Sequence, residues 1–513
     1  MTKGIKRTKR KMPLPPYPTR EFYLDDQPRT LFPLSTNRVL VENGETQINK
    51  FIKQIANGER TFLPQKTVHA NKDRFHLRRT VKLDVIAEYY IYDLVRRNRA
   101  KFLKPHSMEK RHYGYRFKEG RPQPPSESYK SFKSSIWFEG VISTKRYLTF
   151  DISSYFNSIY HHDLHAWFSA LEPKVASDTE VFGKFLREIN SGRSLDCLPQ
   201  GLYPTKMIGN DFLRFVEENC LLKSELAYRF MDDICLIDGD EANLLSDFAQ
   251  IQKILGQKGL SINSAKTRSG QAEEFDESED DIEELKKKLL KRRRQAVISS
   301  YDLDDEDELE GQNSETDEEL GPITEEEIDF AITLLTKEKI LEEDAELVLI
   351  VMRDHVNRIT EYLHLFTKDF PHLAKNFYLL CSEAEDKDQI AQIVIDALSS
   401  DSYISEYQLF WYGMMLEKYL MGCAKSNEII SLLFKHENAT DISKSKILEI
   451  QDHRFGLPEL REGFLREGRS DWLAWSSAVG SLSLKKQARN YLLGYFKNGS
   501  EMNKLIADIL ESV

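Results

Sequence analysis

Three zones of the chain differ in how hydrophobic and polar residues alternate. Up to about residue 150 the segments are short and mixed, with apolar residues at helical spacing over 84–103. Between about 145 and 268, apolar runs that suit strands alternate with amphipathic runs that suit helices, which predicts an α+β fold. From about 322 onward the segments are amphipathic and helical. We therefore expect an α+β unit followed by an all-α unit, built as a stacked helical array or a helix bundle.

Changes of charge along the chain divide it further. We predict a basic N-terminal arm at 1–35, the α+β unit at 36–272, a charged insert at 273–321 and the helical unit at 322–513. The insert has acidic blocks on both sides of one basic run, a composition typical of a solvated, disordered segment. The alternative is that it mimics nucleic acid and occupies a basic groove.

Composition excludes several classes of protein. No apolar run approaches the roughly 18 residues of a membrane span, and the basic N-terminus lacks the apolar core of a secretory signal. The five cysteines show no CxxC spacing, which argues against a structural zinc site and a disulfide framework. We therefore expect a cytoplasmic protein that does not bind membranes.

The net charge of −11 by itself counts against a nucleic-acid binder. Much of that charge lies in the insert, however, and the first 120 residues are rich in lysine and arginine. A polyanion responds to the local field of a groove rather than to the average surface. Binding to nucleic acid therefore remains open.

Two adjacent aspartates interrupt an apolar run at 228–238, YRFMDDICLID. The apolar flanks predict two short strands joined by a tight turn that carries Asp232 and Asp233. Upstream, the strand pattern of 146–150 ends at Asp151. If the two strand ends are adjacent, all three carboxylates lie around one spot.

Three carboxylates at such range cannot all stay ionised without cations. Oxygen ligands of this kind select Mg²⁺, with Mn²⁺ as the alternative, over zinc or copper. Two such ions about 3.5–4 Å apart are the usual device for clamping the attacking and leaving oxygens of a phosphoryl transfer. The sequence therefore predicts two Mg²⁺ ions in one phosphoryl-transfer site.

Four motifs resemble, in order and spacing, the palm of reverse transcriptases. They are the strand ending at Asp151 with Phe156 after it, LPQGLYPTKMIGNDFL at 198–213, FMDD at 230–233 and GLSINSAKT at 259–267. FMDD is similar to the YxDD box of that family, with Phe in place of Tyr. The resemblance implies a fingers and palm fold, an RNA-directed DNA polymerase acting on dNTPs, and a metal set at Asp151, Ile152, Asp232 and Asp233.

The resemblance also implies roles for further residues, each with a simpler alternative. Phe156 would exclude the sugar 2′-hydroxyl, or it is a core aromatic. Gln200 and Gly201 would bring backbone close to the nucleotide, because glycine lacks a Cβ, or they form a plain turn. Lys266 would donate a proton to pyrophosphate, or it is an ordinary exposed lysine.

Upstream, residues 75–94 and 112–120 look like the fingers segments of the same family. There Arg78, Arg79 and Lys82 are the candidates to hold the triphosphate.

The helical half that follows the palm looks like that of the abortive-infection and unknown-group reverse transcriptases of bacterial antiphage defence, including those carried by P2-type prophages. That likeness implies a HEAT-like helical domain in place of a thumb, a homo-oligomer and DNA synthesis without an added template. It also implies a DNA product attached to a protein hydroxyl, for which Tyr17 and Tyr23 on the arm are candidates. A noncoding RNA or a second reverse transcriptase subunit is compatible with this picture.

Two other functions remain open from the sequence. One is an RNA-templated reverse transcriptase of the retron or intron type. The other is a non-catalytic scaffold that binds nucleic acid, against which the three intact aspartates argue.

Overall fold

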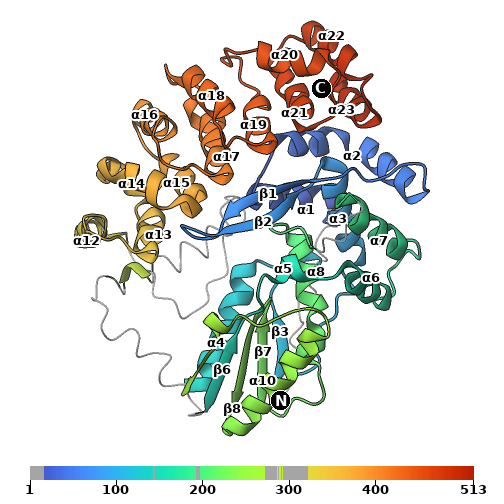
Figure 1. Ribbon diagram of the computed structural model, residues 1–513, viewed down its shortest axis with the longest axis vertical. Helices are drawn as coiled ribbons and strands as arrows, with labels where there is room; N and C mark the ends of the chain where they lie inside the picture. Colours follow the sequence, from blue (N-terminus) through green and yellow to red (C-terminus); the bar gives the residue numbers. More distant parts are fainter. Residues whose placement is uncertain are drawn as a thin grey trace, which may run out of the picture.

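A computed structural model describes residues 17–141, 145–191, 197–271 and 322–513, together with 286, 288–290 and 292. A sheet with its flanking helices lies at one end of the molecule, and most of the helices after residue 322 lie at the other (Figure 1). The N-terminal helices and a β-hairpin lie between these two parts. The predicted α+β unit followed by helices is therefore confirmed.

The main sheet has five strands in the order β3-β7-β8-β6-β9. Its strands are β3 (Lys110–Tyr113), β6 (Arg146–Phe150), β7 (Leu226–Phe230), β8 (Asp233–Asp238) and β9 (Arg268–Gln271). β3 runs parallel to β7, and all other neighbours are antiparallel. The two strand patterns that carry the aspartates are thus direct neighbours in space, because β6 pairs with β8.

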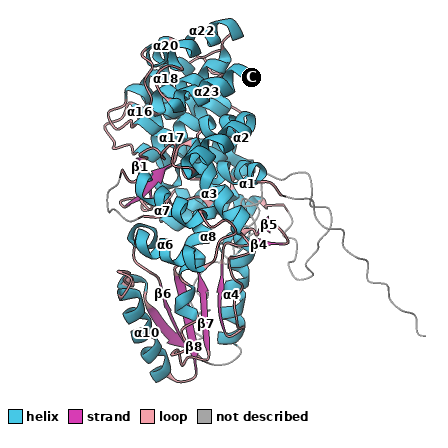
Figure 2. Cartoon of the chain, turned by 90° about the vertical axis from the view of Figure 1, so that its right-hand side faces the viewer, coloured by secondary structure: helices cyan, strands magenta, loops and turns pink. Residues whose placement is uncertain are grey.

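Helices cover both faces of this sheet (Figure 2). α10 (Glu241–Gly256) lies on one face and α4 (Pro125–Val141) on the other. Strand β8 contributes side chains to the cores on both faces. Ile234 and Leu236 belong to the main core, while Cys235 and Ile237 pack with Phe132 of α4. This alternation follows from the two-residue period of a strand, and burial on both faces explains the continuous apolar run.

The N-terminal part folds from residue 17 onward. It contains α1 (Thr19–Asp26), α2 (Ser35–Ala56), the hairpin β1 (Lys66–Asn71) and β2 (Leu77–Lys82), and α3 (Val85–Asn98). Phe22 and Tyr23 of α1 are buried in the main core. The arm predicted at 1–35 is therefore wrong for residues 17–35, and residues 1–16 lie outside the described residues.

The C-terminal helical region consists of helices that begin at residue 325. Its α-helices are α12 (Glu325–Leu335), α13 (Glu342–Val351), α14 (Leu363–Asp369), α15 (Ala374–Cys381), α16 (Lys387–Leu398), α17 (Glu406–Met415), α18 (Ser426–Lys435), α19 (Asp441–Leu448), α20 (Glu459–Arg466), α21 (Trp472–Gly480), α22 (Lys486–Phe496) and α23 (Glu501–Ser512). None of the helices in the described part of the chain is long and apolar enough to cross a membrane.

Part of the predicted charged insert packs on this helical region. Leu289 is fully buried in its core, and Lys286 pairs with Asp344 at 2.6 Å. Arg292 pairs with Glu327 of α12 at 2.8 Å. The prediction of a disordered insert is therefore wrong at these positions, and most of 273–321 lies outside the described residues.

A buried ionic network joins α2 to the C-terminal helical region. The Glu449 carboxylate accepts hydrogen bonds from the backbone N–H groups of Ser35 and Thr36 at 2.9 and 2.6 Å. Lys446, which is fully buried, pairs with Glu449 at 2.6 Å and with Glu417 at 2.8 Å. The helix N-terminus offers unpaired N–H groups and a positive dipole end, so a carboxylate from another segment suits it.

The same helix packs closely on the last helix of the chain. A Cβ at Gly44, in the middle of α2, would lie 2.5 Å from Cγ1 of Ile509 in α23. One hydrophobic core therefore continues from the palm through α2 and α3 into α21 and α23.

The Glu449→Ala variant is expected to lower the free energy of unfolding by about 3 kcal/mol, because the Lys446 ammonium and two N–H groups lose a buried partner. Thermal unfolding measures this directly, with Glu428→Ala on the exposed face of α18 as the control. Equal unfolding midpoints for Glu449→Ala and the control would contradict the assignment.

Candidate active site

The hairpin β7–β8 places Asp232 and Asp233 at one end of the sheet. Phe230 pairs with Asp233, so Met231 and Asp232 form a two-residue loop. Met231 has φ of 56°, a left-handed conformation that such loops use and that costs a non-glycine residue of order 1 kcal/mol or more. The surrounding contacts must therefore hold this loop in place.

Asp151 arrives from the neighbouring strand β6. Phe150 pairs with Ile234 of β8, so Asp151 follows the paired end of β6 and lies beside Asp233. Asp151 is only 7% exposed, and the next residue, Ile152, is also buried. The three predicted carboxylates thus share one end of the sheet.

Burial and mutual repulsion make ionisation of this cluster costly. Burial, followed by the charges of Asp233 and Asp151, raises the pKa of Asp232 to about 6. Burial also raises the pKa of Asp233, against the opposing charges of Lys266 and Lys133. Lys266 donates a hydrogen bond to Asp151 at 2.8 Å, and this bond raises the pKa of its ammonium group. Lys266 is therefore the cation that partly compensates the three acids.

Divalent cations fit this donor set. Oδ1 of Asp151 is buried without a hydrogen-bond donor among the described residues, and Asp232 resists ionisation. A hard cation would relieve both, since carboxylate oxygens are its preferred ligands. No three His, Cys, Asp or Glu side chains of the described residues lie close enough to form a finished metal cluster, and the cation now beside Asp151 is Lys266. The residues that would hold metal are Asp151, Asp232 and Asp233, with Ile152 beside them.

A buried arginine holds the loop that carries the aspartates. Arg229, 1% exposed, donates to the carbonyl oxygen of Met231 at 2.8 Å. It also donates to both carboxylate oxygens of Glu217 at 2.7 and 2.8 Å and to the carbonyl of Asn210 at 2.9 Å. Paired charges hold the pKa of Glu217 down to about 2 despite its burial. The positive-φ conformation at Met231 is thus supported by a direct hydrogen bond from a buried guanidinium.

Sequence reasoning missed Arg229, although a signal was present. Its neighbours Tyr228 and Phe230 pack toward α4, so the two-residue period turns Arg229 toward the opposite, buried face. A charge at such a position needs a partner. Glu217 lies in α9 (Arg214–Glu217), and nothing in the spacing of the two residues identifies that pairing.

The predicted Gln-Gly step is tied to the hairpin β1–β2. The backbone N–H of Gln200 donates to Oγ1 of Thr80 at 2.8 Å, and Oγ1 donates to the carbonyl of Gln200 at 3.1 Å. Gly201 has φ of 101°, and a Cβ there would lie 2.9 Å from Cγ of Leu31. Glycine is therefore required by both conformation and space, and the step lies against the hairpin that carries the predicted arginines.

The three predicted triphosphate-binding cations differ in their surroundings. Arg78 and Arg79 are partly exposed and form no salt bridge within the described part of the chain. The carbonyl of Arg79 accepts from Asn157 at 3.3 Å, which keeps β2 near the segment after β6. Lys82, in contrast, is 5% exposed and pairs with buried Glu88 at 3.2 Å. The expectation for Lys82 is corrected for this reason, because it already neutralises a buried carboxylate.

Phe156 lies in the short helix α5 (Tyr155–Ser158) directly after Asp151. Its side chain is 8% exposed, and a Cβ at Gly209 of α8 (Tyr203–Phe212) would lie 3.3 Å from its ring. The ring is thus part of the palm core, as the simpler alternative had it. A role at the sugar stays a prediction.

The predicted priming tyrosines do not lie on a mobile arm. Tyr23 is fully buried in α1, and burial raises the pKa of its hydroxyl well above the usual value. Tyr17 donates its hydroxyl proton to Asp25, and the guanidinium of Arg121 lies 5.3 Å from its ring centre. Free reach to the carboxylates is therefore contradicted for Tyr23.

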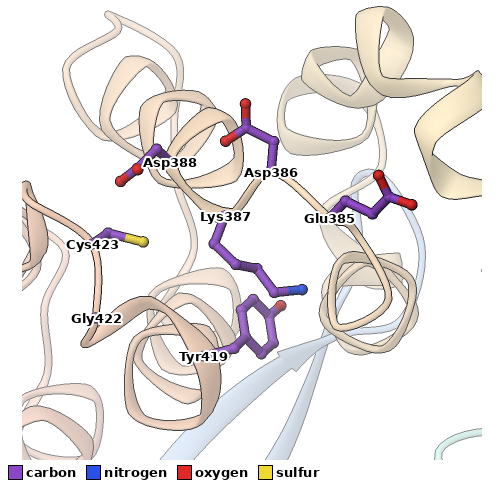
Figure 3. Close-up of a pocket in the computed structure, with 7 residues that line it drawn as sticks. All are labelled: Glu385, Asp386, Lys387, Asp388, Tyr419, Gly422 and Cys423. Atoms are coloured by element: carbon purple, nitrogen blue, oxygen red, sulfur yellow. The ribbon is translucent and has the colours of Figure 1, made fainter.

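A surface pocket far along the chain from these residues lies in the C-terminal helical region (Figure 3). Its lysine, Lys387, donates to the carbonyl of Cys381, the last residue of α15, and to those of Ser382 and Ala384 after it. Burial raises the pKa of the Cys423 thiol to about 11, which keeps it protonated. The Lys387 ammonium is thus occupied by backbone carbonyls, and Cys423 is not a thiolate. Neither residue makes this pocket a reaction site.

Comparison with known families identifies the part of the chain that carries the carboxylates. Residues 100–279 match the reverse transcriptase (RNA-dependent DNA polymerase) family. This range includes α4, β6, the hairpin β7–β8 and Lys266. The chain therefore contains a reverse transcriptase domain, as the sequence motifs predicted. No curated protein matches the chain.

Solved structures of telomerases are among those that resemble it. Telomerase from Candida albicans, in complex with a TWJ fragment of telomeric RNA, is 12% identical with a TM-score of 0.28, covering 76% of this chain and 64% of that one. Apo telomerase from Candida tropicalis is 12% identical with a TM-score of 0.32, covering 75% and 73%. None of these matches is specific to the abortive-infection or unknown-group enzymes, so that assignment stays a prediction.

Because the pKa of Asp232 is raised, replacing its carboxyl group should stabilise the folded protein, by an amount that depends on pH. Ionisation costs more in the folded state, so the penalty is fully present above pH 6 and disappears below about pH 4, where the carboxyl is protonated in both states. Without divalent ions, Asp232→Asn should raise the unfolding midpoint by a few degrees at pH 8 and leave it unchanged at pH 3.5. Added Mg²⁺ should stabilise the wild type more than the variant. Equal midpoints at pH 8 would contradict the strained cluster.

Removal of the Arg229 guanidinium should leave the buried Glu217 carboxylate with His112, at 2.9 Å, as its remaining partner. Arg229→Met is expected to cost about 3–5 kcal/mol in free energy of unfolding, and Arg229→Met combined with Glu217→Leu should recover much of it. Chemical denaturation of both variants measures the difference. Equal losses in the single and double variants would show that the ion pair is not what Arg229 contributes.

Proposed function

We propose that the reverse transcriptase domain of this chain polymerises dNTPs into DNA, using two Mg²⁺ ions held by Asp151, Asp232 and Asp233. The single observation that carries the proposal is the convergence of these carboxylates at one sheet end, beside Lys266. A cluster whose ionisation is so costly has little structural value by itself.

Divalent cations bound there would activate the attacking 3′-hydroxyl and neutralise charge on the leaving pyrophosphate. The protein supplies the rest by position. Asp151, Asp232 and Asp233 lie at one end of the sheet, and Arg229 keeps the loop between the strands in its conformation. Lys266 is held protonated beside Asp151, so it carries a proton that can pass to the leaving pyrophosphate oxygen.

The incoming nucleotide would lie between the carboxylates and the hairpin β1–β2. Arg78 and Arg79 are the cations there that remain available for a triphosphate. The Gln200–Gly201 step would approach the base and sugar through its backbone, since Gly201 has no side chain. Phe156 would contact the sugar, exclude its 2′-hydroxyl and so favour deoxynucleotides.

The biological setting we propose is antiphage defence in the cytoplasm, with template-independent synthesis by a homo-oligomer. Support comes from the helical region that follows the palm, which the defence enzymes share in place of a thumb. A HEAT-like arrangement of those helices, and a noncoding RNA or second reverse transcriptase subunit as partner, belong to the same proposal. For protein priming, Tyr17 is the candidate retained, because Tyr23 is enclosed.

A second candidate is RNA-templated DNA synthesis of the retron or intron type. The observation that favours it is the family match itself, because that family is described as RNA-dependent. A non-catalytic nucleic-acid-binding scaffold is favoured least, since a scaffold gains nothing from three acids that repel one another.

Purified full-length protein with labelled dNTPs and Mg²⁺ is expected to form DNA without template, and Asp232→Ala should reduce the rate by more than about a hundredfold. Asp401→Ala, an exposed acid in the helical region, is the matched control. Mn²⁺ in place of Mg²⁺ should support activity, and EDTA should abolish it.

Product made only with an added RNA template would favour the second candidate. Absence of product under both conditions, or equal rates for Asp232→Ala and wild type, would reject polymerase activity.

A further inference from the structure

Helix α4 covers one face of the main sheet, the face to which alternate residues of β8, beginning with Asp233, belong. Asp233 alternates with Cys235 and Ile237 along β8, and these two pack in the same small core as Phe132 and Ile136 of α4. Figure 2 shows α4 on one side of the strands and α10 on the other. α4 is therefore the helix on the carboxylate side of the sheet.

Polar contacts fix α4 against the sheet at two levels. The backbone N–H of Gly114 donates to Oγ of Ser128 at 2.6 Å. About two turns further along, the hydroxyl of Tyr113 donates to Oγ of Ser135 at 2.7 Å. Residues between these two serines are thus held in a defined position relative to β3, the strand that pairs with β7, as a preformed binding site requires.

One aromatic ring of α4 reaches the loop of the aspartates. The ring of Tyr129 lies 5.1 Å from that of Phe230, edge to face, and Phe230 is the residue paired with Asp233. Tyr129 is nevertheless 42% exposed. A part of its ring surface is therefore open beside the carboxylates.

A lysine follows one turn later on the same side of α4. The ammonium of Lys133 lies 5.5 Å from the ring centre of Tyr129 and 5.9 Å from that of Phe132. Lys133 is exposed and forms no salt bridge within the described residues. Lys266 pairs with Asp151 and Lys82 with Glu88. Lys133, in contrast, opposes the charge of Asp233 without forming a salt bridge with it, so its ammonium can also reach a phosphate.

We propose that Tyr129 and Lys133 form a binding site for the growing DNA strand, with a base near its 3′ end stacked on Tyr129 and a backbone phosphate on Lys133. This proposal rests on the proposed polymerase function. It specifies which residues would hold the growing strand during that reaction. An aromatic ring and an ammonium one helical turn apart match the alternation of base and phosphate in a single strand. A free phosphate would have no use for the ring.

Binding of a short fluorescent single-stranded oligodeoxynucleotide to the full-length protein, followed by anisotropy, tests the site apart from catalysis. Tyr129→Ala should weaken binding about tenfold, while Tyr129→Phe should bind like the wild type, because stacking needs the ring and not the hydroxyl. Lys133→Gln should weaken binding and lower the slope of log K against log salt by about 0.7.

Two matched variants control for general effects on the surface. Tyr403→Ala removes a tyrosine that is 70% exposed in the helical region, and Lys253→Gln removes an exposed lysine on α10, across the sheet. Both should bind as the wild type does. Unfolding midpoints of all variants should agree, since Tyr129 and Lys133 are exposed.

The outcomes separate this site from the polymerase function. Wild-type affinity and salt slope in both Tyr129→Ala and Lys133→Gln, or no binding by the wild type, would overturn the site even if the protein makes DNA. Weaker binding in these variants with normal binding in the controls would support the site even if no dNTP is incorporated. An equal loss in the control variants would also overturn it, because the effect would then be a property of the whole surface.

Discussion

The repulsion among three carboxylates at the end of one sheet is the constraint that the palm is organised around. Two cations support the arrangement, and they act in different ways. Lys266 acts on the charge directly, through its contact with Asp151. Arg229 acts from behind, holding the backbone of Met231 while Glu217 neutralises it. The site is thus strained in both charge and backbone, as expected where function rather than stability determines the residues.

The C-terminal helical region takes part in holding the fingers segments in place. Glu449 caps α2, and the hairpin β1–β2 contacts the same region, since Glu406 accepts from the backbone of His69 and Asp369 pairs with Arg74. The hairpin in turn positions the Gln200–Gly201 step through a threonine hydroxyl. A series of contacts therefore links the C-terminal helical region to the predicted nucleotide site, and the fingers share one hydrophobic core with part of that region.

Helix α4 covers the face of the palm sheet opposite to the one that α10 covers (Figure 2). Its small core with β7 and β8 is separate from the main core on the other face, so the middle strands of the sheet are buried on both sides. The carboxylates lie at the ends of these strands, where Asp233 is exposed. The exposed Tyr129 of α4 packs on Phe230 at the same end.

The sequence by itself determined the strand ending at Asp151, the hairpin of Asp232 and Asp233, and the helical half, because each follows from a local period of apolar residues. It also indicated a cation-binding cluster, since paired acids in an apolar run need one. Tertiary structure alone decided that Phe22 and Tyr23 of α1 are buried, that Lys82 forms an ion pair with Glu88, and that Arg229 supports the loop between β7 and β8. These depend on contacts between segments far apart in the chain, and a local pattern carries no information about which distant residue will neutralise a buried charge.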